Sequence, residues 1–271
     1  MKIMYLNVNG FLGDLPIKST STYFPKQCRD TQLPLIVSNL ILEKIKKENE
    51  NEPYDAIFLS EFDPHSKASN NFIEQMNKDG YKEIFSCGQS QKDIDKKYST
   101  STICFMSNNY NGFNNHSDAN TEFLQFCKID ATNPSIPSLF AVHFSPNREK
   151  MCNALETTFS NYRKNRKNRK NGNPILFFGD VNANPDSSEK QAQLNNHTFT
   201  ELIQNNHLDL KEIYDCQPPS QTTRYETRID RVFSNVKGIQ IKTDKTYFEE
   251  GLSDHAALKI TFQIDDSPKE M

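Results

Sequence analysis

Residues 174–183 read PILFFGDVNA and give the clearest strand signal in the chain. Four large apolar residues stand in a row after Pro174, which is typical of a strand buried on both faces. An acid and an amide, Asp180 and Asn182, follow this run directly. Asp180 and Asn182 are also of residue types that are common in turns. A turn alone would not explain the buried apolar run that comes directly before them. We therefore interpret the segment as a strand that presents Asp180 and Asn182 at its end.

Other predicted strands carry polar residues at the same kind of position. These residues are Asn7 and Asn9 for strand 3–8, Glu61 for strand 54–60, His143 for strand 138–143, Asp230 for strand 228–234, and Asp254 and His255 for strand 255–264. If the strands share an edge, their polar ends converge on one site. The site would then combine several carboxylates, amides and two histidines.

The spacing of apolar residues predicts few helices and many strands. The predicted helices are 32–48, 72–79, 147–169 and 197–206; the further strands are 81–86, 101–107, 122–130 and 239–247; the loops are 107–120 and 184–196. Helices that lie between groups of strands favour an α+β sandwich of two packed sheets with helices outside. We expect one domain over residues 1–264 and a short polar tail at 265–271.

Composition excludes several classes of protein. The chain has 271 residues and no apolar run near the roughly 18 needed for a membrane helix. A net charge of −3 excludes a generic polybasic nucleic-acid binder, but it does not exclude a nuclease that contacts phosphates locally. The six cysteines form no zinc-binding spacing, so we expect reduced thiols. We expect a monomer that is cytoplasmic or exported without a visible signal peptide.

The residue types at the strand ends suit one kind of chemistry. Carboxylate and amide oxygens are hard ligands that favour Mg²⁺, with Mn²⁺ as a substitute. A histidine beside a carboxylate is held in one tautomer, and its protonated form is stabilised. Amide side chains donate hydrogen bonds to phosphate oxygens without adding negative charge. This set indicates metal-assisted attack of water on a phosphate ester.

Six short motifs connect the chain to a known family. They are LNVNG (6–10), LSEF (59–62), VHFSPN (142–147), FGDVNA (178–183), RIDRVF (228–233) and LSDH (252–255). In this order, and over residues 3–262, they resemble the endonuclease/exonuclease/phosphatase superfamily with the DNase I-like fold. The resemblance implies a four-layer α/β/β/α sandwich with two mostly antiparallel sheets.

The resemblance also implies a role for each motif residue. Glu61 would be the main Mg²⁺ ligand, with Asn9 or Asp254 assisting, and Asn7 would support Glu61 or the phosphate. Asp180 would align or deprotonate the attacking water, Asn182 would hold a phosphate oxygen, Asp230 would orient His255 against the scissile phosphate, and His143 would face that phosphate from the other side. The general base stays open between Asp180 and the Asp230–His255 pair.

Departures from family patterns narrow the substrate. The chain has no tryptophan, and it has His143 where abasic-site endonucleases usually carry tyrosine. Residues 228–231 read RIDR and lack the WCDR signature of inositol-polyphosphate 5-phosphatases. The histidine motif and RIDRVF are similar to DNase I-like nucleases and 5′-tyrosyl-DNA phosphodiesterases. We therefore expect a DNA endonuclease; the alternatives are a phosphoesterase acting on a phospholipid, nucleotide or protein-linked phosphodiester, and least of all a catalytically dead binding module.

Three further interpretations concern charged residues. The basic run RKNRKNRK at 163–170 is predicted to be a solvated helix end, because cations favour a helix C-terminus; the alternative is nonspecific attraction of phosphates. The run precedes strand 174–179 and Asp180 follows that strand, so we expect the run to lie roughly 17 Å or more from the metal. Lys92, Lys96 and Lys97 are better candidates for substrate contact. Asp230 and Arg231 have an alternative interpretation as a structural salt bridge.

Overall fold

A computed structural model describes residues 1–13, 32–85, 101–110, 112–113, 126–133, 136–144, 147, 149, 152–153, 156, 174–205 and 209–263. The strands are β1 (Lys2–Asn7), β2 (Ala56–Phe62), β3 (Tyr81–Phe85), β4 (Ser101–Ser107), β5 (Phe126–Ile129), β6 (Ser138–His143), β7 (Ile175–Asp180), β8 (Lys211–Ile213), β9 (Asp230–Ser234), β10 (Gln240–Asp244) and β11 (Ala257–Thr261). The helices are η1 (Asn9–Phe11), α2 (Leu33–Asn49), α3 (Lys67–Lys78), α6 (Lys190–Asn205) and α7 (Thr246–Glu249). Within these ranges, no helix has the length and apolar character needed to cross a membrane.

The strands form two mixed sheets. One has six strands in the order β10-β11-β1-β2-β4-β3, and the other has five in the order β5-β6-β7-β9-β8. Each sheet contains one parallel pair, β1 with β2 and β6 with β7, and its other pairs are antiparallel. The expected α+β fold with two mostly antiparallel sheets is confirmed.

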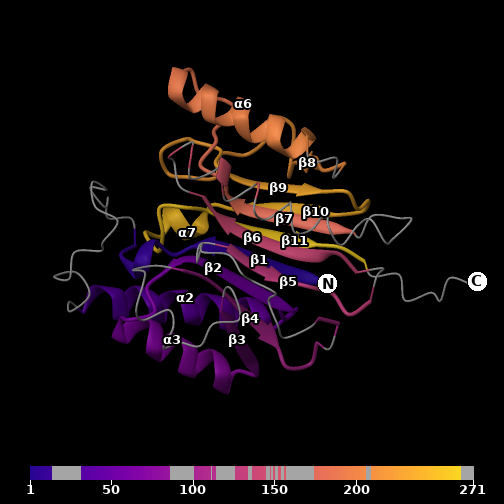
Figure 1. Ribbon diagram of the computed structural model, residues 1–271. Coiled ribbons are helices and arrows are strands. Elements are labelled where there is room, and N and C mark those ends of the chain that lie inside the picture. The colour runs from indigo at the N-terminus through magenta and orange to yellow at the C-terminus, as the bar shows by residue number, and fades with distance from the viewer. Residues whose placement is uncertain are drawn as a thin grey trace, which may run out of the picture.

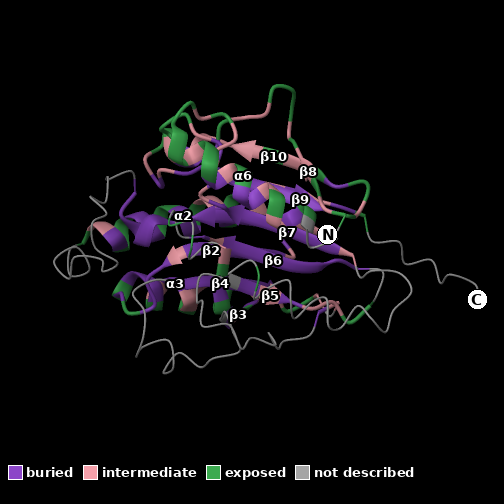
Figure 2. Cartoon of the chain, turned by 45° about the horizontal axis from the view of Figure 1, so that its top comes forward, coloured by how far each residue is buried: buried purple, intermediate pink, exposed green. Residues whose placement is uncertain are grey.

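The two sheets pack face to face, and helices cover their outer faces (Figure 1). Helices α2 and α3 lie against the six-stranded sheet, and α6 lies on the far side of the five-stranded sheet. Three apolar clusters separate these four layers, and the middle cluster fills the space between the sheets. Figure 2 shows the central strands as largely buried and the helices as exposed on one side.

Alternation of side chains explains why the central strands are apolar on both faces. In β1, Ile3 and Tyr5 enter the core between the sheets, whereas Met4 and Leu6 pack toward the helices. A strand buried in this way needs a continuous apolar run. The chain leaves the sheets where such runs stop, and that is where the polar site residues begin.

The predicted loop at 184–196 is wrong in its second half, because α6 begins at Lys190. Most side chains in its first turns are exposed, so the segment has little apolar periodicity to reveal a helix. Helix α3 likewise begins at Lys67 rather than at 72. The Ser66 side chain caps it by accepting a hydrogen bond from the Ser69 N–H at 3.0 Å.

The predicted strand 239–247 is also too long. Strand β10 ends at Asp244, whose Oδ1 accepts hydrogen bonds from Thr246 N at 3.1 Å and Thr246 Oγ1 at 2.6 Å. An aspartate that bonds the backbone two residues ahead favours a turn, and here that turn leads into α7. Most of the predicted helix 147–169 lies outside the described residues.

Candidate active site

Glu61 leaves the regular alternation of β2 through a β-bulge. The pairing of β2 with β4 shifts register between Leu59 and Phe62, and Glu61 has a φ of 51°. This left-handed backbone is strained for a residue that carries a Cβ. A side-chain hydrogen bond from Asn7, at the end of β1, supports the Glu61 carboxylate. The sequence-predicted neighbours Asn7 and Glu61 therefore meet.

Asn9 and Asn182 have similar backbone conformations, with φ values of 47° and 48°. The Asn9 N–H donates to Asn7 Oδ1, and Asn9 Nδ2 donates to the Gly13 carbonyl, both at 3.0 Å. With Glu61, three predicted site residues therefore have positive φ. Backbone strain of this kind is more frequent at functional sites.

The five-stranded sheet brings three more predicted residues together. His143 and Asp180 are register partners at the ends of the parallel strands β6 and β7. Asp230 is the first residue of β9 and is the register partner of Asp180. All three side chains therefore lie at the same edge of the sheet.

His255 precedes β11 of the six-stranded sheet and contacts β9 of the five-stranded sheet. Its Nδ1 is 2.8 Å from Asp230 Oδ2, the contact expected of an orienting carboxylate. The His255 N–H donates to Ser253 Oγ at 3.0 Å, and that hydroxyl donates to the Asn7 carbonyl at 2.5 Å. The preceding residue, Asp254, has Oδ1 4.0 Å from His255 Nε2.

The Asp180 carboxylate lies between the two histidines. Its Oδ2 is 3.7 Å from His143 Nε2 and 4.0 Å from His255 Nε2. Glu61 Oε1 is 3.0 Å from the same His143 nitrogen. Residues from both sheets therefore form one continuous cluster of charged groups.

Burial and charge act in opposite directions on Glu61 and His143. Burial alone would raise the pKa of Glu61, but the neighbouring His143 lowers it to about 2. Burial would lower the pKa of His143, but the Glu61 carboxylate raises it above its ordinary value. The pair is therefore stable as carboxylate and imidazolium.

The pKa values of Asp180 and His255 are also shifted from their ordinary values. Burial raises the pKa of Asp180 to about 7, opposed by His143 and reinforced by the charge of Asp230. Burial would lower the pKa of His255, but Asp230 raises it to about 10. At neutral pH the site therefore has a carboxyl group that can gain or lose a proton beside a protonated imidazole.

Asn182 is held at the end of β7 by two hydrogen bonds. Its N–H donates to Asp180 Oδ1 at 2.8 Å, and its Nδ2 donates to the Phe144 carbonyl at 2.6 Å. The first bond fixes the Asp180 carboxylate, and the second ties the loop after β7 to the end of β6.

Two donor sets among the described residues could hold a cation. Asp180, Asp230 and His255 offer ligand atoms within 4.8 Å of one another. Glu61 and Asp254 are a further candidate pair of ligands, since both are carboxylates beside this cluster; burial raises the pKa of Asp254, and the Glu61 charge raises it further. Their side chains are 25% and 20% exposed, so this second set is open to solvent.

An arginine–glutamate network behind the site was not predicted. Arg231 Nε and Nη2 donate to the two Glu212 carboxylate oxygens at 2.7 and 2.6 Å, and Arg231 Nη1 donates to the Ala183 carbonyl at 3.2 Å. Arg228 also pairs with Glu212 and, at 3.0 Å, with Asp186. The alternative interpretation of an Asp230–Arg231 salt bridge is wrong, because these two residues have separate partners. The two arginines of RIDR were the available signal.

Tyr5 is a second feature that the sequence analysis missed. It is fully buried, and its hydroxyl contacts the Asp180 N–H at 2.9 Å. Burial, followed by the charges of Asp230 and Asp180, raises its pKa well above the ordinary range, so the phenol stays protonated. Tyr5 stands between the apolar residues Met4 and Leu6, so its local sequence indicates only a core residue.

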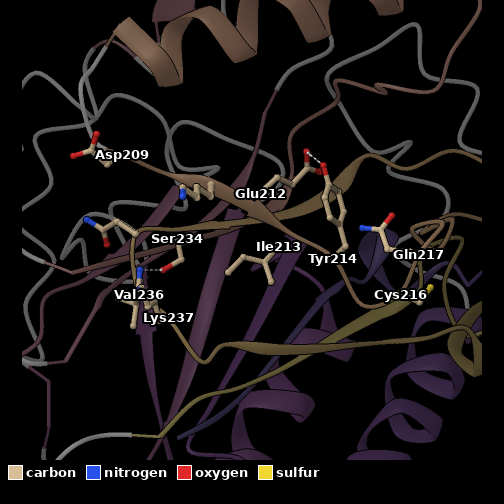
Figure 3. A pocket seen from close by; sticks show the side chains of 11 residues that line it. Asp209, Glu212, Ile213, Tyr214, Cys216, Gln217, Ser234, Val236 and Lys237 are labelled. Atoms are coloured by element: carbon tan, nitrogen blue, oxygen red, sulfur yellow. Dashed lines mark hydrogen bonds between the residues drawn. The ribbon is translucent and has the colours of Figure 1, made fainter.

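A surface pocket of about 500 Å³ lies beside the edge strand β8 and contains none of the predicted site residues. Figure 3 shows Tyr214 directed toward Glu212, to which its Oη donates at 3.2 Å. Ser234 at the end of β9 lines this pocket, whereas Asp230 at the start of β9 belongs to the charged cluster. The pocket is therefore separate from the candidate site.

Some predicted features lie outside the described residues. They are the basic run 163–170, Lys92, Lys96, Lys97 and the tail at 265–271.

A family model described as "Endonuclease-reverse transcriptase" matches residues 138–259, which contain His143, Asp180, Asp230 and His255. No curated protein sequence matches the chain.

Solved structures resemble nearly the whole chain. TDP2 from C. elegans is 14% identical with a TM-score of 0.58, over 96% of this chain and 74% of that chain. The human Nocturnin catalytic domain with bound sulfate is 15% identical with a TM-score of 0.60, over 97% and 94%. The 3′ phosphatase NExo from Neisseria, bound to a product DNA hairpin, is 14% identical with a TM-score of 0.59, over 97% and 99%. At these identities the likeness establishes a shared fold.

Proposed function

We propose that the chain belongs to the endonuclease/exonuclease/phosphatase superfamily, with its DNase I-like fold, and that it is a Mg²⁺-dependent phosphodiesterase that cleaves DNA internally. The meeting of Glu61, His143, Asp180 and His255 at one edge of two packed sheets carries this proposal. Within that cluster, Glu61 lies 3.0 Å from His143, and Asp180 lies 3.7 and 4.0 Å from the two histidines. The set supplies anionic cation ligands and cationic donors for phosphate oxygens.

Asp180 is the general base in this proposal. A pKa of about 7 allows it to take a proton from water at neutral pH. The Asn182 N–H holds one of its carboxylate oxygens at 2.8 Å, so the other faces the histidines. This arrangement favours Asp180 over His255, which is protonated at neutral pH and has no lone pair to accept a proton.

The histidines act as donors to the phosphate. Asp230 holds the Nδ1 of His255 at 2.8 Å and leaves Nε2–H to donate to a phosphate oxygen. His143 donates from the other side once a phosphate replaces part of its contact with Glu61. Asn182 Nδ2 has a second hydrogen, beyond the one given to Phe144, for another phosphate oxygen.

Glu61 is the principal metal ligand in this proposal, with Asp254 or Asn9 assisting and Asn7 supporting Glu61. The donor set fits Mg²⁺, because partly exposed carboxylates leave room for a cation that keeps several waters. Bound Mg²⁺ would supply Lewis-acid stabilisation of the charge on the phosphate. Mn²⁺ prefers the same oxygen ligands and would substitute.

The buried set of Asp180, Asp230 and His255 is a weaker choice for the metal. His255 Nδ1 and Asp230 Oδ2 already bind each other, and the protonated imidazole has no lone pair for a metal. These three residues fit the roles of base, orienting carboxylate and phosphate donor better.

DNA is the proposed substrate because one structural neighbour, NExo, was solved with a product DNA hairpin. Phospholipid, nucleotide and protein-linked phosphodiesters are the alternatives that a substrate panel would separate.

The first experiment is nicking of supercoiled plasmid with Mg²⁺ and with EDTA, beside the Glu61→Ala and His255→Ala variants. Glu250→Ala is a matched control, because Glu250 is 55% exposed and pairs with Lys44. We expect nicking that requires Mg²⁺, is lost in both site variants and is retained in the control. A folded wild-type protein that leaves the plasmid intact would contradict the DNA assignment, and hydrolysis of another ester in the panel would then identify the substrate class.

A further inference from the structure

A buried hydroxyl beneath the site connects three strands that carry site residues. Tyr5 of β1 is fully buried, and its ring packs edge-on against Phe178 at 6.0 Å in the core between the sheets. Its Oη lies 2.7 Å from Ser60 Oγ of β2, 3.1 Å from the Val142 carbonyl of β6 and 2.9 Å from the Asp180 N–H of β7. One oxygen atom therefore links the six-stranded sheet to two strands of the five-stranded sheet.

The hydrogen-bonding capacity of this oxygen is fully used. A phenol has one hydrogen to donate and two lone pairs to accept with. The Asp180 N–H occupies one lone pair, and the Tyr5 hydrogen goes to the Val142 carbonyl. Ser60 must then donate its hydroxyl hydrogen to the second lone pair. All three bonds are buried, so losing the oxygen would leave the Asp180 N–H without its partner.

Each partner of Tyr5 is a site residue or directly precedes one. Ser60 precedes Glu61, Val142 precedes His143, and Asp180 is itself in the cluster. The distances from Tyr5 Oη thus control how far the Glu61 bulge lies from the ends of β6 and β7. Those ends must stay close for Glu61 Oε1 and His143 Nε2 to remain at 3.0 Å.

Gly179 makes this close approach possible. Its φ is 131°, and a Cβ there would lie 2.1 Å from the Val142 carbonyl oxygen and 3.1 Å from Tyr5 Cε2. No real Cβ tolerates the first distance. The absence of a side chain at Gly179 therefore leaves space for the Tyr5 ring and the Val142 carbonyl to meet beneath Asp180.

We propose that Tyr5 is a positioning residue whose hydroxyl sets the separation between Glu61 on one sheet and the His143–Asp180 pair on the other. The inference rests on the proposed hydrolytic function, and it assigns Tyr5 no contact with substrate. Removing the hydroxyl would leave the packing of the ring intact and loosen the alignment of the two halves of the site.

Tyr5→Phe tests this role, with Tyr54→Phe as the matched control. Tyr54 is also buried, and its Oη donates to Glu48 at 2.6 Å in a region outside the site. We expect Tyr5→Phe to lower kcat by about ten- to a hundredfold, the scale of a small misplacement of catalytic groups, with KM little changed. Tyr54→Phe should retain wild-type kcat. A wild-type kcat in Tyr5→Phe would overturn the proposal.

A double-mutant cycle separates positioning from general loss of stability. If Tyr5 acts through Asp180, then Tyr5→Phe should cost much less in the Asp180→Asn background than in wild type. Equal costs in the two backgrounds would contradict the proposal. Ser60→Ala, which removes a partner from the other side of the hydroxyl, should reduce kcat in the same direction and serves if Tyr5→Phe does not fold.

A second readout does not depend on activity. The ¹⁵N chemical shifts of the His143 ring should move in Tyr5→Phe, because the contacts of that ring with Glu61 and Asp180 change, and they should stay in place in Tyr54→Phe. If the wild-type protein hydrolyses no ester in the panel, the proposed function fails and the histidine spectra still decide the positioning role. Unchanged His143 shifts would then overturn it.

Discussion

The Glu61 carboxylate of one sheet lies 3.0 Å from the His143 imidazole of the other. The contact joins Oε1 to Nε2 and keeps the carboxylate charged and the imidazole protonated. A proton on His143 and a cation bound to Glu61 both neutralise the negative charge of the Glu61 carboxylate. Protonation of His143 should therefore weaken binding of the cation, and binding of the cation should weaken protonation of His143.

This competition predicts that Mn²⁺ binds more tightly as pH rises through the titration of His143. The pKa of His143 is raised while Glu61 is free of metal, so metal binding releases its proton. Release of one proton allows at most about a tenfold gain in affinity per pH unit. Titration of Mn²⁺ followed by electron paramagnetic resonance measures the affinity at each pH. In the His143→Gln variant the affinity should depend less on pH than in wild type.

Glu61→Gln should remove most of the metal affinity while the protein stays folded. The amide keeps the size of the side chain but loses the charge that a divalent cation requires. Mn²⁺ titration and urea unfolding test the two parts separately. Glu250→Gln should bind Mn²⁺ as wild type does, and a Glu61→Gln variant with full affinity would exclude Glu61 as the main ligand.

Asp180→Asn should lower kcat at least about 100-fold, the scale of lost general base catalysis. In wild type, activity should rise with pH through about 7, because Asp180 accepts a proton only when ionised. The variant should lack this acidic limb. Asp244→Asn is the control, since Asp244 pairs with Lys259 away from the site, and it should leave the limb in place.

Asp230→Asn should move the alkaline limb of the pH profile to lower pH. Asp230 counteracts burial and raises the pKa of His255 from 6.5 to about 10, so His255 stays protonated across neutral pH. Without that charge the imidazole loses its proton at lower pH, and activity should fall sooner as pH rises. Profiles of kcat and ¹⁵N spectra of His255 should change together; an unmoved His255 titration would contradict the pairing.

Glu212→Ala should destabilise the protein by about 3–5 kcal/mol, because it leaves the buried guanidinium groups of Arg228 and Arg231 without their shared carboxylate. Urea unfolding measures the change. Glu201→Ala, at a side chain that is 56% exposed, should stay within about 0.5 kcal/mol of wild type.

The difference in stability between wild type and Glu212→Ala should also depend on pH. Burial would raise the pKa of Glu212, but the two arginines lower it below the ordinary value of 4.5. A carboxylate with a lowered pKa contributes its stability above that ordinary value and loses it as pH falls through its folded pKa. The difference between wild type and Glu212→Ala should therefore shrink as the pH falls below about 4.5.

The strand ends that build the site could be predicted because apolar runs stop there abruptly. Strand β6 ends at His143 and β7 ends at Asp180, and each follows a buried segment. A long apolar run and a polar residue at its end are both local signals. The start of α6 at Lys190 gave no such signal, since its first turns face outward and carry mostly polar side chains.

The contacts beneath the site could not be predicted, because their partners are distant in sequence. Tyr5 Oη and the Asp180 N–H are 175 residues apart, and Arg231 and Glu212 are 19 apart. Nothing local to Tyr5 distinguishes a tyrosine that fills a core from one that joins two sheets. Such pairs appear only when the sheets are packed.

The positive φ at Glu61 has a consequence for attempts to make this protein more heat-resistant. Strained backbone of this kind costs about 1–3 kcal/mol, and glycine would relieve it at once. Buried Asp180 carries a similar cost, which an apolar residue would remove. A laboratory selection for thermostability alone would therefore favour losing the side chains on which the proposed hydrolysis depends. Variants from such a selection should be assayed for hydrolytic activity at every round, because the most thermostable variants are expected to be the least active.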